Sequence, residues 1–352
     1  MKKQPLVSIL INNYNYDMFL SEAIESSLNQ TYPNIEVIIV DDGSTDRSAE
    51  IINSYQDKVI PVLKANGGQA SAFNAGFAIA KGEIIIFLDS DDVLLPDIVE
   101  KVVLAFQANQ NVVKVQYRLQ VIDVNSQPTG EIVPLSSCKM PNGDLKPQIF
   151  KFGSYTWPPT SGNAFKATML RQLLPMPEDV YRISADRYLN NLSVMFGTVV
   201  SLDEIGGFYR VHGKNNFRTT KINLTKLRRQ LIGAAKVHAK KRELARALYS
   251  LDISYVESRD LLHMMNRIIV LKLDRQNYPL TDSLLNLCWQ GLIVSLVYCD
   301  YHWSRKLVLA SWFVLMFLVP NSMAENITNQ IFYPNTRGGF TRKLLATVKK
   351  FA

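Results

Sequence analysis

Two apolar runs near the start of the chain end abruptly in acidic turns, and no other feature of the sequence constrains the fold as strongly. Ile35–Val40 leads directly into the sequence DDGS, and Ile84–Leu88 leads directly into the sequence DSDD. Short apolar runs rich in β-branched residues are typical of strands buried on both faces of a parallel sheet. Ligands of such sheets bind outside the carboxyl ends of the strands. The pattern therefore predicts an α/β domain whose carboxylates gather at one edge of the sheet.

Helical patterns alternate with strand patterns in this part of the chain. Leu6–Ile11 is a further β-type run, and Met18–Gln30 has apolar residues at helical spacing. The predicted helices Thr45–Tyr55 and Ala70–Ala80 follow, with a short strand at Val59–Lys64 between them. This alternation predicts a mostly parallel central sheet flanked by helices. Because asparagines interrupt the first apolar run and no small-residue cleavage site follows, we expect a buried first strand rather than a signal peptide.

Residues 93–220 show a more mixed pattern. It predicts, in chain order, a helix at Asp97–Gln107, a strand at Val112–Ile122, a Pro- and Gly-rich loop from about Gln127 to Pro147, a helix at Asp186–Met195 and a short strand ending at Tyr209–His212. Beyond residue 221 the pattern is almost wholly helical. We therefore expect a main domain at residues 1–220 and a mainly helical C-terminal region at residues 221–352.

Charge is distributed unevenly between these two regions. The chain has a formal net charge of +8, yet residues 221–352 hold 20 Lys and Arg against 8 Asp and Glu, whereas residues 1–220 hold 19 against 23. Such a basic region favours contact with an anionic surface, either lipid headgroups or nucleic acid. The alternative is a solvated face that only keeps the protein soluble.

The C-terminal region contains two apolar stretches, at Leu284–Tyr298 and Leu307–Pro320. Each is shorter than the ~20 residues that a membrane-spanning helix needs. Tryptophans, a tyrosine and basic residues mix here, a combination favoured at membrane interfaces. Two interpretations stay open: a region that lies on a membrane surface, or helices that pack on each other or on a partner subunit of a homo-oligomer.

The three cysteines, Cys138, Cys288 and Cys299, have the spacing of neither a disulfide framework nor a zinc site. We therefore expect a reducing compartment, the cytoplasm.

The carboxylates of the DSDD turn are the residues with the strongest chemical signal. Acidic groups so close together repel one another, and burying them is costly unless a cation or hydrogen-bond donors compensate. Mg²⁺ or Mn²⁺ typically takes one or two protein carboxylates together with substrate phosphates and water. An isolated acidic turn of this kind is more often one that simply caps the following helix. The second acidic strand end, DDGS, favours a nucleotide site in which one end binds base or ribose and the other holds a metal ion.

Residues 5–95 resemble the opening of the family-2 glycosyltransferases with the GT-A fold. The segment VSILINNYN is similar to V-S-V-I-I-P-x-Y-N, IIVDDGSTD to V-V-D-D-G-S-x-D, and NGGQASAFNAG to N-x-G-x-x-x-A-x-N-x-G, which the D-x-D strand follows. The three blocks occur in the family's order and at suitable distances. One departure is Asn12, which stands where the family frequently has proline.

The resemblance implies a role for each matching residue. Asp42 would contact the base, Asp89 would hold the ribose, and Asp91 would ligate the metal, Mn²⁺ or Mg²⁺. The full set of implied donor-binding residues is Asn12, Tyr14, Asp41, Asp42, Asn66, Gly67, Asn74, Asp89 and Arg210. For Asn74, a helix residue that satisfies nearby backbone is an equal alternative.

The likeness continues more weakly downstream. The segment ISADRYL resembles the family's E-D-x-x-[LF] motif, which makes Asp186 the implied catalytic base, although Ala185 replaces the glutamate. Without the resemblance, Asp186 would be interpreted as an acidic residue favoured by a helix dipole. The segment YRVHGKNN resembles the closing Y-R-x-H-x-x-N element, in which His212 would ligate the metal or bind the diphosphate and Arg210 would neutralise phosphate charge.

Taken with the residues, the resemblance implies an inverting, metal-dependent glycosyltransferase with its GT-A catalytic domain at residues 1–220. The expected donor is a nucleotide-sugar, with UDP favoured, and the expected acceptor is a hydroxyl of a glycan or lipid-linked molecule at the inner face of the cytoplasmic membrane. A non-catalytic relative that only binds nucleotide-sugars is the alternative. A phosphotransferase is disfavoured because G-x-x-x-x-G-K-[ST] is absent, and no nucleic-acid-binding motif accompanies the basic region.

Overall fold

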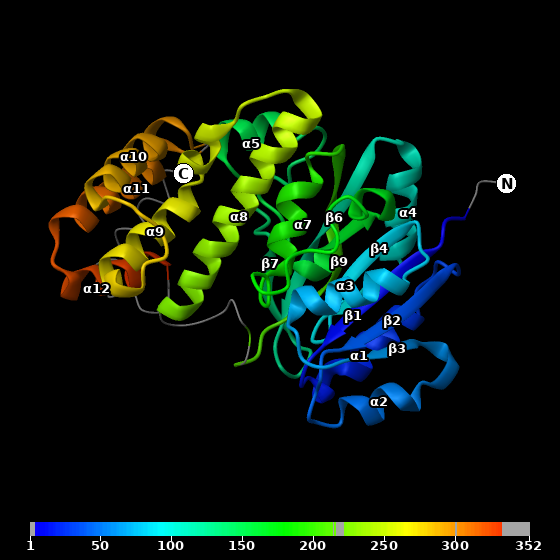
Figure 1. The fold of residues 1–352 in the computed structure, drawn as a ribbon. Coiled ribbons are helices and arrows are strands. Elements are labelled where there is room, and N and C mark those ends of the chain that lie inside the picture. The colour runs from blue at the N-terminus through cyan, green and yellow to red at the C-terminus, as the bar shows by residue number, and fades with distance from the viewer. Residues whose placement is uncertain (1–3, 214, 216–221, 300, 333–352) are drawn as a thin grey trace. The chain divides into compact units, whose positions relative to one another are not determined.

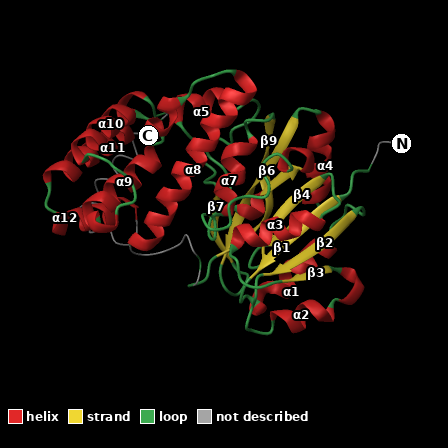
Figure 2. Cartoon of the chain, in the orientation of Figure 1, coloured by secondary structure: helices red, strands yellow, loops and turns green. Residues whose placement is uncertain are grey.

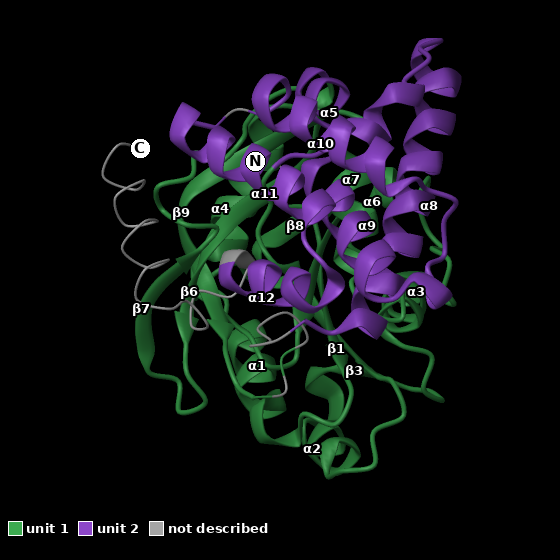
Figure 3. Cartoon of the chain, turned by 90° about the vertical axis from the view of Figure 1, so that its left-hand side faces the viewer, with its two compact units in different colours: residues 1–146, 156–215 green, residues 147–155, 216–352 purple. Residues whose placement is uncertain are grey.

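The computed structural model describes residues 4–213, 215, 222–299 and 301–332 (Figure 1). The chain divides into two compact units, which Figure 3 distinguishes by colour. Unit 1 comprises residues 1–146 and 156–215, and unit 2 comprises residues 147–155 and 216–352. Residues 147–155 belong to unit 2 although they lie within the sequence of unit 1. This excursion is short, and no sequence pattern marks it.

Unit 1 is built on a nine-stranded sheet with the order β3-β2-β1-β4-β8-β6-β9-β5, and β7 pairs with β6 (Figure 2). The strands are β1 (Val7–Asn13), β2 (Ile35–Asp41), β3 (Ile60–Leu63), β4 (Ile84–Asp89), β5 (Val93–Leu94), β6 (Val112–Ile122), β7 (Pro128–Val133), β8 (Asn163–Lys166) and β9 (Thr198–Arg210). The first four strands in this order pair in parallel, as the sequence predicts. The β6–β9 pair is also parallel, whereas β5, β7 and β8 pair antiparallel with their neighbours.

The register of the central strands sets up the functional edge of the sheet. Asn12 of β1 is paired with Asp89 of β4, and Asn13 of β1 is paired with Asp41 of β2. Since parallel strands end at the same edge, both acidic turns follow strands that flank the polar end of β1. The acidic groups therefore gather at one edge, as predicted.

Helices cover both faces of this sheet. They are α1 (Asp17–Leu28), α2 (Ser48–Ser54), α3 (Gln69–Ile79), α4 (Ile98–Ala108), the short α6 (Ala167–Leu170) and α7 (Ala185–Ser193). Buried residues of α1 and α4 share one apolar core with Ile9 and Ile86 of the sheet. On the other face, Phe73 of α3 stacks on Phe87, their ring centroids 4.2 Å apart. Successive strand residues point to opposite faces, which explains why these strands are apolar at nearly every position.

Two predicted elements were wrong in extent. The Pro- and Gly-rich loop at 127–147 contains the strand β7, whose residues are mostly exposed and are held by pairing with β6. The strand that ends near Tyr209 is not short, because β9 has 13 residues and pairs along the length of β6.

The described part of unit 2 is helical, as predicted for the C-terminal region (Figure 2). Its helices are α5 (Lys146–Phe152, whose first residue belongs to unit 1), α8 (Leu224–Tyr249), α9 (Leu261–Leu273), α10 (Leu284–Val297), α11 (Trp303–Leu318) and α12 (Asn321–Phe332). An apolar core joins α9, α10, α11 and α12. The two apolar stretches therefore do pack on each other, with Gly291 of α10 directly against the ring of Phe313. Among the described residues, no helix combines the length and the apolar character needed to cross a membrane.

Candidate functional site

The carboxylates at the end of β2 are fully occupied by hydrogen-bond donors of the protein. Asp42 accepts from Lys64 Nζ at 2.7 Å, from the Gly67 N–H at 2.9 Å and from the Gly68 N–H at 2.6 Å. Asp41 accepts from Asn13 Nδ2 and from the N–H and hydroxyl of Ser44. Both side chains are buried. This strand end is therefore a closed network that shapes the turn around Gly67 and Gly68.

Gly68 is required at its position for two reasons. Its φ of +90° lies in the region that favours glycine, and a Cβ there would approach the Arg182 backbone to within 2.7 Å. This turn opens α3, so Asp42 fixes where that helix begins.

The carboxylates at the end of β4 have fewer hydrogen-bond donors of the protein than those at the end of β2. Asp89 accepts from Asn12 Nδ2 at 2.9 Å and from Gln69 Nε2 at 3.2 Å. Asp92 accepts from the Ser161 hydroxyl at 2.6 Å and from the backbone N–H of Arg210 at 2.9 Å. Asp91 Oδ2 lies 2.8 Å from His212 Nε2.

Burial and mutual repulsion perturb this second group. Burial, followed by the charge of Asp91, raises the pKa of Asp89 to about 7. Burial and the charges of Asp91 and Asp89 also raise the pKa of Asp92. The hydroxyl of Tyr16 has a raised pKa, chiefly through burial and then through the charge of Asp91. Three carboxylates thus share a volume in which the protein does not fully compensate their charge.

His212 is held in place by aromatic rings. Its ring centroid lies 5.2 Å from that of Tyr16 and 5.1 Å from that of Phe19, and its side chain is buried. These contacts orient Nε2 toward Asp91.

Arg210, expected to neutralise phosphate, directs its guanidinium to protein groups. It donates to the Asp91 carbonyl at 2.8 Å, to the Ser126 hydroxyl at 2.7 Å and to Glu22, and it lies over the Phe19 ring. Only 1% of its side chain is exposed. The guanidinium thus supports the backbone of the DSDD turn.

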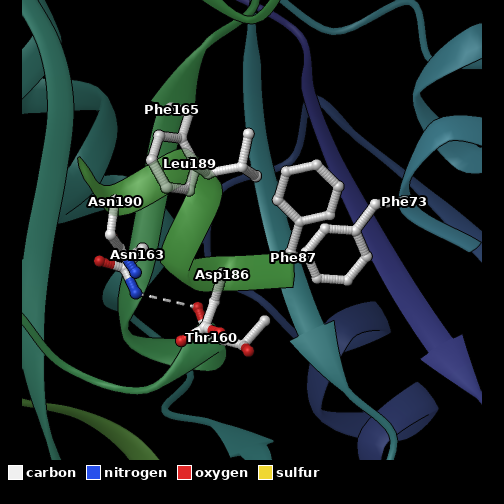
Figure 4. A pocket seen from close by; sticks show the side chains of 8 residues that line it. All are labelled: Phe73, Phe87, Thr160, Asn163, Phe165, Asp186, Leu189 and Asn190. Atoms are coloured by element: carbon white, nitrogen blue, oxygen red, sulfur yellow. Dashed lines mark hydrogen bonds between the residues drawn. The ribbon is translucent and has the colours of Figure 1, made fainter. Parts of the chain in front are cut away.

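Asp186 lies in the first turn of α7 and lines a small hollow with an empty volume of about 160 Å³ (Figure 4). Figure 4 shows Phe73, Phe87 and Phe165 on the apolar side of this hollow and Thr160 and Asn163 near Asp186. Burial raises the pKa of Asp186, while the charges of Arg187 and Lys114 partly offset that effect. A carboxylate with a raised pKa is a stronger base than an ordinary aspartate.

Gln69 connects the strand ends with α7. Its Nε2 donates to Asp89, and its Oε1 accepts from the Ala185 N–H at 3.0 Å, directly before Asp186. Gln69 also follows Gly68, whose N–H is bound by Asp42. A chain of direct contacts therefore links Asp42, Gln69, Asp89 and the first turn of α7.

The remaining predicted donor residues have diverse surroundings. Tyr14 is 47% exposed. Asn66 donates to the Asp42 carbonyl and accepts from Arg182. Asn74 both donates to and accepts from the Met176 backbone, so its amide fixes the loop at 176–178, as expected for the alternative in which it satisfies nearby backbone.

Sequence patterns missed four residues of this site: Tyr16, Gln69, Asp92 and Ser161. Asp92 was visible within DSDD and Gln69 within NGGQ, but nothing local indicated which side chain each would contact. Ser161 accepts from the Asp89 N–H and donates to Asp92, so it bridges two positions of the acidic turn.

The donor atoms present fit a divalent cation only in part. No group of three or more His, Cys, Asp or Glu side chains suitable for a metal occurs among the described residues. The pair of Asp91 and His212 supplies one carboxylate and one imidazole beside uncompensated negative charge. This set suits an ion that completes its coordination with substrate phosphate and water, as Mg²⁺ and Mn²⁺ do.

Comparison with known proteins agrees with this geometry. The family model described as "Glycosyl transferase family 2" matches residues 8–168. An uncharacterized glycosyltransferase of Nostoc sp. is 41% identical over 217 residues, which cover 60% of this chain and 66% of that protein. Hyaluronan synthase of Pasteurella multocida is 47% identical over 103 residues, 28% of this chain and 11% of that protein.

Glycosyltransferase GlyG of Streptococcus pneumoniae is 46% identical over 99 residues, 27% of this chain and 33% of that protein. The chain thus spans a third or less of two of these relatives and just under two thirds of the Nostoc protein.

Solved structures extend the likeness to the whole fold. The crystal structure of S. aureus TarS 1–349 superposes with a TM-score of 0.55 at 15% identity, covering 91% of this chain and 89% of that one. Its complex with UDP-GlcNAc has a TM-score of 0.53 at 16% identity, covering 91% and 90%. The family match identifies residues 8–168 as a glycosyl transferase family 2 domain, and the shared architecture shows that the chain has the GT-A fold.

Proposed function

We propose that this chain transfers a sugar from a nucleotide-diphosphate donor to a hydroxyl acceptor, with inversion at the anomeric carbon. The observation that carries the proposal is the chain of contacts from Asp42 through Gln69 to Asp89 and the first turn of α7. It connects Asp89, which lies near the proposed metal ligand Asp91 in sequence, with the turn that precedes the proposed base Asp186. We propose that residues 1–220 form the GT-A catalytic domain.

On the donor side, the β2 end and the β4 end have different tasks. Asp42 holds the Gly67–Gly68 turn against which the nucleoside would lie, and the exposed Tyr14 would contact the nucleoside as well. Asp89, held by Asn12 and Gln69, would accept a hydrogen bond from a ribose hydroxyl. A diphosphate buried at this site would need cationic or hydrogen-bonding partners, because burying an unpaired charge is costly.

Asp91 and His212 would hold the divalent cation, Mn²⁺ or Mg²⁺. When bound, such an ion neutralises the diphosphate and stabilises the charge that develops on the departing phosphate oxygen. Arg210 acts indirectly by fixing the Asp91 carbonyl and thereby the position of the acidic turn.

Asp186 is the proposed general base. Its ionised carboxylate takes the proton of the acceptor hydroxyl while that oxygen forms a bond to the anomeric carbon. The bond from this carbon to the diphosphate oxygen breaks on the opposite face, and its electron pair leaves with the nucleoside diphosphate. The raised pKa of Asp186 favours acceptance of the proton.

The comparisons support the choice of donor and acceptor class. TarS has been crystallised with UDP and with UDP-GlcNAc, which favours a UDP-sugar donor here. The hyaluronan and chondroitin synthases of Pasteurella multocida, similar over about a quarter of this chain, favour a glycan acceptor. We propose a glycan or lipid-linked acceptor at the inner face of the cytoplasmic membrane.

The test is a screen of nucleotide-sugars for hydrolysis and transfer with Mn²⁺, with Mg²⁺ and with chelator, for the full chain and for Asp186→Asn. We expect one donor to be turned over only with cation, and Asp186→Asn to bind it normally without turnover. The matched control is Asp57→Asn, an exposed aspartate on the surface of unit 1. If the parent chain and Asp186→Asn both bound a donor and neither turned it over under any condition, the chain would instead be a nucleotide-sugar-binding module.

A further inference from the structure

Helix α10 exposes a continuous apolar stripe. Leu285, Trp289, Ile293 and Val297 follow one another at intervals of four residues, and each is 38–62% exposed. The opposite side of the helix, including Leu287, Gly291 and Val294, is buried in the core of unit 2. Intervals of four residues place the exposed side chains on one face of the helix.

Helix α11 exposes a second stripe of the same kind. Trp303, Leu307, Val314 and Leu318 lie on one face and are 44–69% exposed, with the exposed Ser311 between them. Its buried side, which includes Trp312 and Phe313, belongs to the same core as that of α10. Figure 1 shows the two helices side by side. Both stripes therefore lie away from the shared core, and we call these eight residues the α10–α11 face.

Exposed apolar area on this scale is unusual for a surface that meets only water. Single exposed apolar residues are common, but contiguous patches mark surfaces that bind a protein, a ligand or a membrane. No charged residue occurs in Leu284–Val297, and the only charged residues in Trp303–Leu318 are Arg305 and Lys306. The face thus lacks acidic groups entirely.

The charged and aromatic residues at the start of α11 indicate the kind of partner. The Arg305 guanidinium lies 4.0 Å from the Tyr301 ring centroid, and Lys306 Nζ lies 5.1 Å from that of Trp303. Aromatic rings combined with basic side chains are favoured where apolar lipid meets anionic headgroups. A second copy of this chain fits less well, because it would bring together two regions that each hold 20 basic and 8 acidic residues.

The dimensions of the helices decide between lying on a bilayer and crossing it. Helices of 14 and 16 residues are about 21 and 24 Å long, shorter than the ~30 Å hydrocarbon core. They can rest in the interface with one face inserted but cannot span it.

We infer that the α10–α11 face inserts into the surface of an anionic lipid bilayer. The inference deepens the proposed function by naming the surface on which a lipid-linked acceptor would be met. Only the purpose of membrane attachment rests on the proposed function, since lipid binding itself is measured without sugar transfer.

The test compares the full chain with the triple variant L285S/W289S/L307S by flotation with vesicles of phosphatidylcholine, with and without phosphatidylglycerol. The parent chain should float with the mixed vesicles, and the triple variant should bind them at least about tenfold more weakly, since three inserted side chains are lost. The control L248S/L262S removes exposed leucines of α8 and α9 outside the face and should bind like the parent. Replacing these exposed apolar side chains with serine keeps the net charge constant and leaves the buried core unchanged.

Two further measurements separate the remaining outcomes. R305Q/K306Q should reduce binding to mixed vesicles by roughly tenfold but leave the weaker binding to phosphatidylcholine unchanged. Tryptophan emission of the parent should shift to shorter wavelength on vesicle binding, because Trp289 and Trp303 enter lipid while Trp312 is already buried.

Equal vesicle binding by the parent and triple variant would overturn the inference, as would a parent chain that never floats. A dimeric parent and a monomeric triple variant in light scattering would assign the face to a second copy and would also overturn it. Donor hydrolysis measured on the same samples keeps the two proposals apart. Unchanged hydrolysis with lost flotation supports the inference, whereas a parent that floats but hydrolyses no donor would count against the proposed function alone.

Discussion

The ends of β2 and β4 carry similar acidic sequences, but their carboxylates are held in opposite ways. At the β2 end, Asp42 is bound by two backbone N–H groups and by Lys64. At the β4 end, Asp92 is buried and Asp89 is half-buried beside Asp91, and the pKa values of both are raised. Carboxylates that the protein itself satisfies stabilise a turn, whereas carboxylates left with surplus charge are suited to a cation and its ligand. We therefore propose a structural task for the β2 end and a chemical task for the β4 end.

The largest expected effect is the loss of turnover in Asp186→Asn, next to Ala185, whose N–H donates to Gln69. We expect kcat to fall by about 10³-fold, within the range for a general base, with the donor Kd unchanged. Steady-state kinetics and calorimetric donor binding check this. Turnover within a few-fold of the parent would move the chemistry away from this end of the sheet.

The proposed role of Asp186 also predicts how kcat/KM falls at acidic pH. Burial raises the pKa of Asp186, and the base must be ionised, so kcat/KM should fall as the pH is lowered through a value above the usual aspartate range. The fall approaches about tenfold per pH unit below that value. Because ionising a carboxyl of raised pKa costs the folded state, Asp186→Asn should also unfold at a higher temperature at pH 7–8. If kcat/KM instead fell in the ordinary aspartate pKa range, and at the same pH in Asp186→Glu, Asp186 would not be the base.

Substitutions at the two strand ends should change stability in opposite directions. Asp42→Asn leaves Lys64 and a backbone N–H without their charged acceptor and should lower the free energy of unfolding by about 2 kcal/mol. Asp89→Asn removes a buried charge that its neighbours repel and should raise it by roughly 1 kcal/mol when neither cation nor donor is present. Denaturant unfolding of both variants checks the signs. An equal decrease in the free energy of unfolding in both variants would contradict the distinction between the two strand ends.

The smallest expected effect is that of Lys64→Met. The ion pair with Asp42 is partly exposed, and Asp42 keeps its two backbone donors, so the loss should be about 1 kcal/mol or less. Donor turnover should change by no more than about twofold, because the β2 end is assigned a structural task. A large loss of turnover in this variant would mean that the β2 end also takes part in chemistry.

Sequence reasoning was most successful where local patterns determine structure. Ile35–Val40 and Ile84–Leu88 form the predicted strands, and the acidic turns follow at the same sheet edge, since buried parallel strands need apolar residues on both faces. The helical character of the C-terminal region was equally visible. The family resemblance, carried by residues 5–95, is confirmed by the family match over residues 8–168.

Features that depend on distant pairing were not predictable. The sequence of β7, PTGEIV, contains Pro and Gly and is largely exposed, so only its partner β6 makes it a strand. The contact of Gln69 with Ala185 spans 116 positions, and that of Arg210 with Glu22 spans 188. A local motif shows which residue types are present, but not which partner each one meets.

The central claim is that the β4 end holds a nucleotide-diphosphate through a cation bound by Asp91. Calorimetric titration of the preferred nucleotide-sugar, with and without Mn²⁺, into the parent chain and Asp91→Asn tests it most directly. The account predicts tight binding of the nucleotide-sugar only to the parent chain and only with Mn²⁺. Equal affinity in all four titrations would contradict it.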